Sequence, residues 1–215
     1  MTVRKFLTTE QKEVLVGSLL GDANLQTETD GRSWRLRMIQ KNENYLVHKY
    51  EIFQNLCGTP PRKSQIFDQR TQKVSERWAF NTLIQPSFRF YALQFYDFDS
   101  ISGLWVKRVP MKIFKLLTPR AIAYWYMDDG SLKWKGNSNA VRFCTDCYSE
   151  AGIARLRKVL FEKFHLETTI QRKDGKPRIA TTEKAYPILR ELVLPYLHTS
   201  MYSKFPDGKK GVLKF

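Results

Sequence analysis

The stretch AIAYWYMDDGSLKW (residues 121–134) decides the fold of this chain. In it an apolar, aromatic run ends on two adjacent aspartates, Asp128 and Asp129. An earlier stretch, VLVGSLLGDANLQ (14–26), ends its apolar run in a similar way, on Gly21 and Asp22. Runs of this length and content are typical of buried helices. The sequence therefore predicts two apolar helices, 10–22 and 119–129, that each end at a carboxylate.

The composition predicts a partner with many negative charges. The chain has 36 Lys and Arg against 21 Asp and Glu, a formal net charge of +15 and a pI near 9.8. Such a surplus favours nucleic acid first and an anionic membrane second. The basic residues lie on alternating strands and not along one amphipathic helix, which argues against the membrane.

No segment of the chain predicts export or membrane insertion. No apolar run reaches the ~20 residues that span a bilayer, and the N-terminal stretch MTVRKFLTTEQKEVL has no signal segment. The chain has three cysteines, Cys57, Cys144 and Cys147. This low and odd number argues against a disulfide scaffold. CTDC (144–147) has metal or redox spacing, but no second pair completes it, so we interpret it as part of a strand end. We expect an intracellular protein of a bacterial cytoplasm, chloroplast or mitochondrion.

The chain also shows an approximate internal repeat. After each apolar helix a stretch of strand-like alternation follows, SWRLRMIQK (33–41) and AVRFCTD (140–146). The pattern of each half predicts helix, two strands, helix, two strands, helix. In the first half the later segments are a helix at 44–58, a hairpin at 64–80 and a helix at 86–97; in the second they are 149–164, 168–181 and 183–197.

This repeat predicts an α+β fold of two pseudo-symmetric αββαββα subdomains, each with an antiparallel sheet. The expected division is 1–103 and 119–215, with a linker region at 104–118. Two such halves can pack about a pseudo-two-fold axis on their apolar helices, where Gly17 and Gly21 allow a close approach. Asp22 and Asp129 would then lie side by side at two helix C-termini, where like charges and the helix dipoles disfavour them. A bound Mg²⁺ removes that cost. The alternative is that both acids merely end surface helices.

At these residues the chain resembles the single-chain LAGLIDADG homing endonucleases. LVGSLLGDA (15–23) and IAYWYMDDG (122–130) are similar to the two nine-residue signature motifs of that family, whose eighth position is the catalytic acid. The second motif departs from it with Tyr124 and Asp128 where small residues are usual, and the first ends in Ala23 and not glycine. The resemblance covers roughly 10–206 and implies saddle-shaped sheets that grip DNA.

The resemblance also implies roles for single residues. It makes Asp22 and Asp129 metal ligands, with the carbonyls of Gly21 and Asp128 as helpers. It implies a polar side chain near the attacking water, for which Gln40 fits well and Asp146 is a departure. It also implies one lysine per half near the scissile phosphates. Lys107 and Lys204 fit that role, because each stands shortly before a proline.

Recognition of bases is expected on one face of each sheet, because an antiparallel ribbon fits the major groove. Arginine suits guanine and glutamine suits adenine in such contacts. The candidates are Arg35, Arg37, Gln65, Arg70, Lys73 and Arg77 in the first half, and Lys133, Lys135, Arg142, Gln171, Arg172, Lys173 and Arg178 in the second.

The resemblance implies Mg²⁺-dependent hydrolysis of both strands of a long, weakly palindromic site, leaving short 3′ overhangs. It implies that two or three divalent ions bind and that Mn²⁺ can replace Mg²⁺. It also implies that the protein acts as a monomer on double-stranded DNA, in intron homing. The alternative is an intron maturase, or a binder of DNA or of host intron RNA that does not cleave. Intact acids in both motifs favour the nuclease, since a pure binder does not need them.

Overall fold

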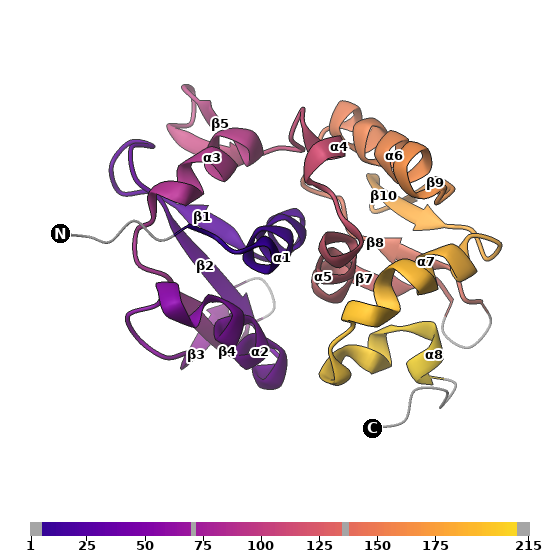
Figure 1. The fold of residues 1–215 in the computed structure, drawn as a ribbon, viewed down its shortest axis with the longest axis horizontal. Helices are drawn as coiled ribbons and strands as arrows, with labels where there is room; N and C mark the ends of the chain where they lie inside the picture. Colours follow the sequence, from indigo (N-terminus) through magenta and orange to yellow (C-terminus); the bar gives the residue numbers. More distant parts are fainter. Residues whose placement is uncertain (1–5, 70–71, 135–137, 210–215) are drawn as a thin grey trace. The chain divides into compact units, whose positions relative to one another are not determined.

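The helices and strands expected from the sequence form in the computed structural model, which describes residues 6–69, 72–134 and 138–209 (Figure 1). These residues make two compact units. The first contains the chain up to Lys12 and Asp22–Ala92, and the second contains Glu13–Gly21 and the chain from Leu93 onward. None of the described helices is long and apolar enough to cross a membrane.

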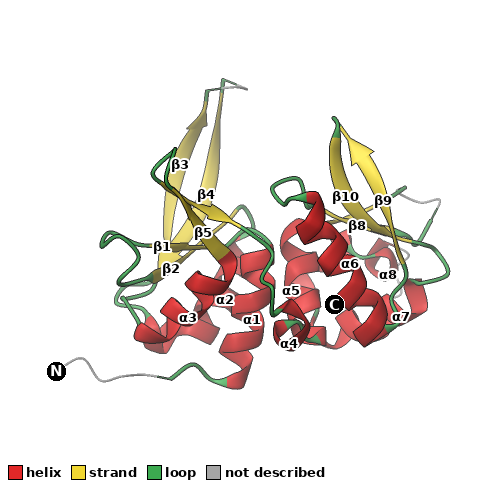
Figure 2. Cartoon of the chain, turned by 90° about the horizontal axis from the view of Figure 1, so that it is seen from above, coloured by secondary structure: helices red, strands yellow, loops and turns green. Residues whose placement is uncertain are grey.

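The first half of the chain has the order αββαββα that the sequence predicts, although contacts assign most of α1 and the end of α3 to the second unit. Its sheet is antiparallel with strand order β1-β2-β4-β3, and α2 packs on β2 and β4 (Figure 2). A short 3-10 helix, η1, follows α2. The elements are α1 (Thr9–Leu20), β1 (Asn24–Gln26), β2 (Arg35–Gln40), α2 (Glu43–Phe53), η1 (Gln54–Leu56), β3 (Arg62–Asp68), β4 (Lys73–Asn81) and α3 (Pro86–Phe95).

The second unit repeats that order and adds elements at both ends. Its main sheet is antiparallel with order β7-β8-β10-β9, and α5 and α6 pack on it. The elements are β5 (Tyr96–Asp99), β6 (Leu104–Lys107), α4 (Ile113–Leu116), α5 (Pro119–Asp129), β7 (Gly130–Leu132), β8 (Val141–Phe143), α6 (Glu150–Phe164), β9 (Thr168–Lys173), β10 (Lys176–Thr181), α7 (Tyr186–Val193), η2 (Leu194–Tyr196), η3 (Thr199–Lys204) and α8 (Pro206–Lys209).

Alternation of side chains builds the core of each sheet. Leu36 and Met38 of β2 are buried against the helices, while Arg35 and Arg37 between them are half-exposed on the other face. Val141 and Phe143 of β8 are buried in the same way. The predicted two-sided pattern of both strands is confirmed, and it leaves one face of each sheet for a partner.

Local signals also form as expected. The Ser149 hydroxyl accepts a hydrogen bond from the Gly152 N–H and so caps the start of α6. Asp174 and Gly175 both have positive φ, 52° and 77°, which is the turn that an Asp-Gly pair favours between two strands. This turn joins β9 to β10 and fixes their register.

The segment Glu13–Gly21 packs closely on α5 within the second unit. A β-carbon on Gly17 would lie 2.9 Å from the Tyr124 Cβ and closer still to the Ala121 carbonyl oxygen. A β-carbon on Gly21 would lie 2.5 Å from the Asp128 Cβ. The two glycines therefore permit the helix contact that the sequence predicts, and the larger Tyr124 and Asp128 of the second motif are accommodated by them.

Three pieces of structure were not expected from the sequence. β1 and β7, of three residues each, directly follow the motifs and complete the sheets. β5 and β6 pair as a separate two-stranded sheet. The stretch 104–118 expected as a linker region contains β6 and α4.

Candidate active site and nucleic-acid interface

Asp22 lies two residues after the end of α1, where its side chain is exposed. The last residue of β2, Gln40, is buried, and its side-chain amide donates a hydrogen bond of 3.0 Å from Nε2 to the Asp22 Oδ2. β2 therefore presents a neutral donor to the first motif aspartate. The structure brings together these two predicted site residues in the first unit.

Two lysines reach the ends of the motif helices in the second unit. Lys107 Nζ donates to the Gly21 carbonyl oxygen at 2.9 Å. Lys204 Nζ donates to the carbonyl oxygens of Met127 at 2.6 Å and Asp128 at 2.9 Å. Gly21 and Asp128 hold the same position in the two motifs, immediately before the aspartate. Positive charge at helix C-termini is favourable, because the last carbonyls there carry partial negative charge.

Buried tyrosines fix the backbone around these lysines. The Tyr126 hydroxyl donates to the Lys204 carbonyl oxygen at 2.5 Å, and the Tyr148 hydroxyl donates to the Leu20 carbonyl oxygen at 3.0 Å. Burial raises the pKa of both tyrosines well above their usual value, so both stay protonated as donors. Tyr126 of the second motif thus holds the backbone of Lys204 in addition to packing in the core.

The sheet registers show which residue of the second unit matches Gln40. Arg37 pairs with Asn24, the second residue after the first motif aspartate, and Arg142 pairs with Ser131, the second after the other. Gln40 stands three residues after Arg37, and Thr145 stands three residues after Arg142. The counterpart of Gln40 is therefore Thr145 and not Asp146, which corrects the positional match made from sequence.

Neither Thr145 nor Asp146 repeats the role of Gln40. The buried Thr145 hydroxyl donates to the Pro177 carbonyl oxygen at 2.8 Å. Asp146 forms a bidentate ion pair with Arg178, at 2.7 Å from Nε and 2.6 Å from Nη2. The Arg178 guanidinium lowers the pKa of Asp146, so this carboxylate stays charged at neutral pH. The first unit has Lys41 and Ala79 at the corresponding register positions, so this ion pair belongs to the second unit alone.

The cysteines carry no sign of a metal centre. Within residues 6–69, 72–134 and 138–209, no three His, Cys, Asp or Glu side chains are grouped as metal ligands. Burial raises the pKa of the Cys57 thiol to about 11 and also raises the pKa of Cys144 and Cys147, so all three are protonated at neutral pH.

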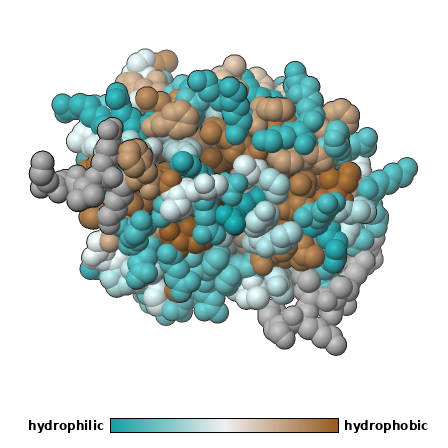
Figure 3. All heavy atoms as spheres, in the orientation of Figure 1, coloured by the Kyte–Doolittle hydropathy of each residue, from teal (hydrophilic) through white to brown (hydrophobic). Residues whose placement is uncertain are grey.

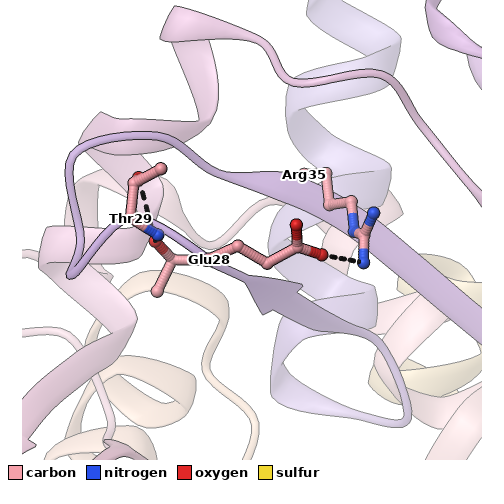
Figure 4. A network of polar contacts seen from close by, with 4 residues as sticks. Glu28, Thr29 and Arg35 are labelled. Atoms are coloured by element: carbon pink, nitrogen blue, oxygen red, sulfur yellow. Dashed lines mark hydrogen bonds and ion pairs between the residues drawn. The ribbon is translucent and has the colours of Figure 1, made fainter.

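The exposed face of the first sheet carries most of the predicted recognition residues. Pairing places Arg35, Arg37, Arg77 and Lys73 on one face, since Arg37 lies opposite Asn81 and alternate residues of β4 share that face. Arg35 is held by an ion pair with Glu28 at 2.6 Å, in the loop between β1 and β2 (Figure 4).

Gln65 lies on the other face of this sheet. It pairs with Glu76, which shares its face with the buried Phe80. Its prediction as a base-contacting residue on the same face as Arg37 is therefore wrong.

The second sheet has the corresponding face. Gln171 pairs with Arg178, and Lys173 pairs with Lys176, so all four share the face of Arg142. Lys133 lies just beyond β7 on this side, and the Arg142 guanidinium donates to its carbonyl oxygen at 2.8 Å. Arg172 lies on the helix side opposite Pro177 and pairs with Glu150 at 3.1 Å. The prediction of Arg172 on the recognition face is wrong.

Other polar residues of these faces were missed from the sequence. Asn24 and Gln26 lie opposite Arg37 and Arg35, but their strand was too short to predict. Arg62 pairs with Ala79 on the same face, and Lys176 flanks the Asp-Gly turn. The turn itself was a sufficient signal for Lys176, because a two-residue turn makes its flanking residues a pair. Arg70 and Lys135 lie outside the described residues.

The chain is similar to known proteins over almost its whole length. Residues 12–189 match the LAGLIDADG DNA endonuclease family. DNA endonuclease I-ChuI of Chlamydomonas applanata is 47% identical over 96% of this chain and 99% of its own. The cytochrome b mRNA maturase bI2 of Saccharomyces cerevisiae is 30% identical over 89% of this chain, which corresponds to 46% of that protein.

Solved structures show the same fold. The homing endonuclease I-WcaI bound to its DNA recognition sequence matches 93% of this chain and 87% of its own with a TM-score of 0.84, at 24% identity. A variant of I-DmoI in complex with its target DNA and in the presence of Mn matches 86% of this chain and 93% of its own with a TM-score of 0.53, at 14% identity. The repeated αββαββα order, the two motif helices and these similarities lead to one conclusion: the chain belongs to the LAGLIDADG DNA endonuclease family.

Proposed function

We propose that this protein is a site-specific DNA endonuclease that cuts both strands of a long, weakly palindromic target and leaves short 3′ overhangs. One observation carries the proposal. In each motif a lysine binds the carbonyl of the residue that precedes the aspartate, Lys107 at Gly21 and Lys204 at Asp128. A carboxylate and an ammonium held at one helix end, twice in one chain, suit two equivalent phosphodiester cleavages. The 47% identity to DNA endonuclease I-ChuI supports the same reaction.

The donors at the motif ends fit a hard divalent cation. Asp22, Asp129 and the carbonyls of Gly21 and Asp128 offer only oxygen, and no larger cluster of metal-ligating side chains exists among the described residues. Mg²⁺ is bound in proteins by one or two carboxylates and keeps several waters, whereas zinc sites use nitrogen and sulfur. We therefore assign Asp22 and Asp129 as ligands of Mg²⁺. We infer that the site binds two or three divalent ions and that Mn²⁺ can replace Mg²⁺. When bound, such ions lower the pKa of water and stabilise the charge on the transferred phosphate.

The remaining residues have roles that their contacts support. The Gln40 amide orients the Asp22 carboxylate and can donate to a nearby water. Lys107 and Lys204 stabilise the negative charge that develops on the phosphate, because their ammonium groups are already held beside the motif ends. Asp146 positions Arg178 on the recognition face, so its role in cleavage is indirect.

Recognition would use the exposed sheet faces in the major groove. An antiparallel ribbon fits that groove, and the two faces carry different side chains, so the target is only weakly palindromic. Since one chain contains both motifs, we infer that it acts as a monomer. We infer action inside a cell, in a bacterial cytoplasm, chloroplast or mitochondrion, where intron homing takes place.

The test is substitution of each motif aspartate. Asp22→Asn and Asp129→Asn should each abolish double-strand cleavage while DNA binding stays within about threefold, because the change keeps size and removes only the ligand charge. Asp30→Asn, an exposed residue whose φ of 50° suits asparagine, serves as the control and should cleave normally. Cleavage is measured on plasmid DNA with Mg²⁺, and binding by gel shift. Double-strand cleavage at the unchanged rate by either motif variant would contradict the assignment.

Splicing assistance is the second candidate function, favoured by the 30% identity to the yeast cytochrome b mRNA maturase bI2. The two functions separate in one comparison. A maturase that does not cleave would bind the intronless DNA or the intron RNA with and without Mg²⁺ and would leave DNA intact. A nuclease converts supercoiled target plasmid to linear product only when Mg²⁺ is present.

A further inference from the structure

The β5–β6 hairpin exposes large apolar side chains and ends at Lys107, the lysine to which we assign a role at the scissile phosphate. Phe98 is 55%, Leu104 63% and Ile101 96% exposed. On the face drawn in Figure 3, hydrophobic atoms lie in groups among hydrophilic ones. β6 ends at Lys107, whose ammonium binds the Gly21 carbonyl oxygen. The hairpin therefore starts at the motif end and carries an apolar tip away from it.

The base of the hairpin is firmly held. Arg108 makes three hydrogen bonds there. Its backbone N–H donates to the Phe95 carbonyl at 2.7 Å, and its guanidinium donates to the carbonyls of Leu93 at 3.0 Å and Gln94 at 3.2 Å. The same guanidinium pairs with Asp97 at 3.1 Å. An element anchored in this way keeps its direction when its tip meets a partner.

The tip is also built to present its apolar residue outward. The Asp99 carboxylate accepts hydrogen bonds from the Ile101 N–H at 3.0 Å and the Ser102 hydroxyl at 2.7 Å. The Gly103 N–H donates to the Asp99 carbonyl at 2.8 Å, at a positive φ of 68° that suits glycine. Both acids of the hairpin thus serve its own structure, Asp99 in the turn and Asp97 with Arg108. The turn costs little further ordering on binding and presents Ile101 to a partner.

We propose that this hairpin is an apolar wedge that enters the minor groove of the DNA target beside the phosphate that Lys107 serves. The proposal rests on the proposed function, because Lys107 marks the place of the phosphate. Leu104 is three residues from Lys107, or roughly 10 Å of extended strand, and a minor groove is roughly 6 Å wide. Exposed Ile, Leu and Phe side chains at this distance match the residues that proteins insert between base steps from the minor groove.

The chemistry of the patch also favours DNA bases over phosphates as its contact. The four charged side chains of the hairpin and its base, Asp97, Asp99, Lys107 and Arg108, sum to zero. In a chain of net charge +15, a neutral apolar tip cannot add phosphate contacts. It can bury apolar surface against unstacked bases. The wedge would widen the groove at the cut site and expose the phosphodiester beside Lys107 to cleavage.

The experiment uses the full chain and a duplex selected from a random library for tight binding to it. Ile101→Ser, Leu104→Ser and the double variant remove the apolar tip without touching the turn contacts of Asp99. Phe161→Ser, a 54% exposed apolar residue of α6, is the matched control. Binding is measured without divalent ions across a range of salt concentrations. 2-Aminopurine at the central base steps of the duplex reports unstacking through its fluorescence.

The double variant should raise the Kd about tenfold, since part of two aliphatic side chains is no longer buried. The slope of log Kd against log salt should stay as in the unchanged protein, because no phosphate contact is lost. The unchanged protein and the Phe161 variant should raise the 2-aminopurine fluorescence, and the double variant should not.

A Kd within twofold of the control with equal fluorescence overturns the wedge. A second result also overturns it: the unchanged protein self-associates, the double variant is monomeric, and the Kd for DNA is the same for both. The tip would then bind protein and not DNA. Cleavage of the same duplex on adding Mg²⁺ is read separately, and its absence overturns the nuclease and not the wedge.

Discussion

Lys107 and Lys204 stabilise the ends of the motif helices at the place where we propose that they also act in cleavage. Each ammonium binds the carbonyl oxygen of the residue that precedes a motif aspartate and so compensates the negative end of that helix. Without a divalent ion the carbonyls already have a cationic partner. We therefore expect the helix ends to keep their structure in protein prepared without metal.

Lys107→Met and Lys204→Met should each lower the rate of cleavage by about 10²-fold, the usual loss when one charge-stabilising donor is removed. The Kd for target DNA should rise less than fivefold, because one phosphate contact among many is lost. Single-turnover cleavage and gel shift measure the two effects on the same preparation.

Lys163→Met is the matched control for these variants. Lys163 Nζ also donates to two backbone carbonyls, of Phe114 at 2.9 Å and Leu117 at 2.8 Å, but it lies far from the motifs in sequence. Its replacement should lower the melting temperature and leave the cleavage rate of the folded protein unchanged. Equal rate losses in all three variants would show that the two site lysines act only through stability.

At the scale of an element, the close contact between α1 and α5 depends on Gly17. Alanine normally stabilises a helix by about 1 kcal/mol relative to glycine. At Gly17 the added methyl would overlap the Ala121 carbonyl and the Tyr124 Cβ at 2.9 Å, so both helices would have to separate.

Gly17→Ala should therefore destabilise the protein by about 2 kcal/mol, in the range found for overpacked cores. Chemical denaturation followed by circular dichroism measures the change. Ala154→Gly, at an exposed position of α6, should cost about 1 kcal/mol through helix propensity alone. A Gly17 variant at least as stable as the unchanged protein would rule out the tight packing.

The β9–β10 hairpin offers a comparison within one element. Arg178 and Arg172 lie on opposite faces, and each pairs with an acid, Asp146 and Glu150. If the face of Arg142 contacts DNA, Arg178→Ala should raise the Kd at least tenfold and relax base preference at one position, since a good arginine contact to guanine is worth about 1–3 kcal/mol. Arg172→Ala should stay within twofold. Competition binding with single-base variants of the target distinguishes the two, and the reverse order would mean that the other face meets DNA.

At the scale of the whole molecule, the formal charge of +15 predicts strongly salt-dependent binding. A protein that neutralises about 6–10 phosphates loses about 10³–10⁵ in affinity between about 50 and 200 mM salt, because counterions are released from DNA. We expect this protein to fall in that range, as measured by fluorescence anisotropy with labelled target. A loss of less than tenfold over the same interval would show that its charge is not directed at DNA.

The sequence by itself determined the class of the protein. Two apolar runs ending at Asp22 and Asp129, with a repeated helix and strand pattern around them, identified the fold, because periodicity and helix ends are local properties. The same locality made the hairpin at Asp174–Gly175 predictable.

Only the tertiary structure decided which residues share a face and which side chains meet. β1 and β7 are too short to give a periodic signal, and the register they set makes Thr145, and not Asp146, the counterpart of Gln40. A shift of one residue in a strand moves a side chain to the opposite face, so Gln65 and Arg172 were misplaced by alternation alone. The lysine contacts to Gly21 and Asp128 join segments 86 and 76 residues apart, and no local pattern encodes such a separation.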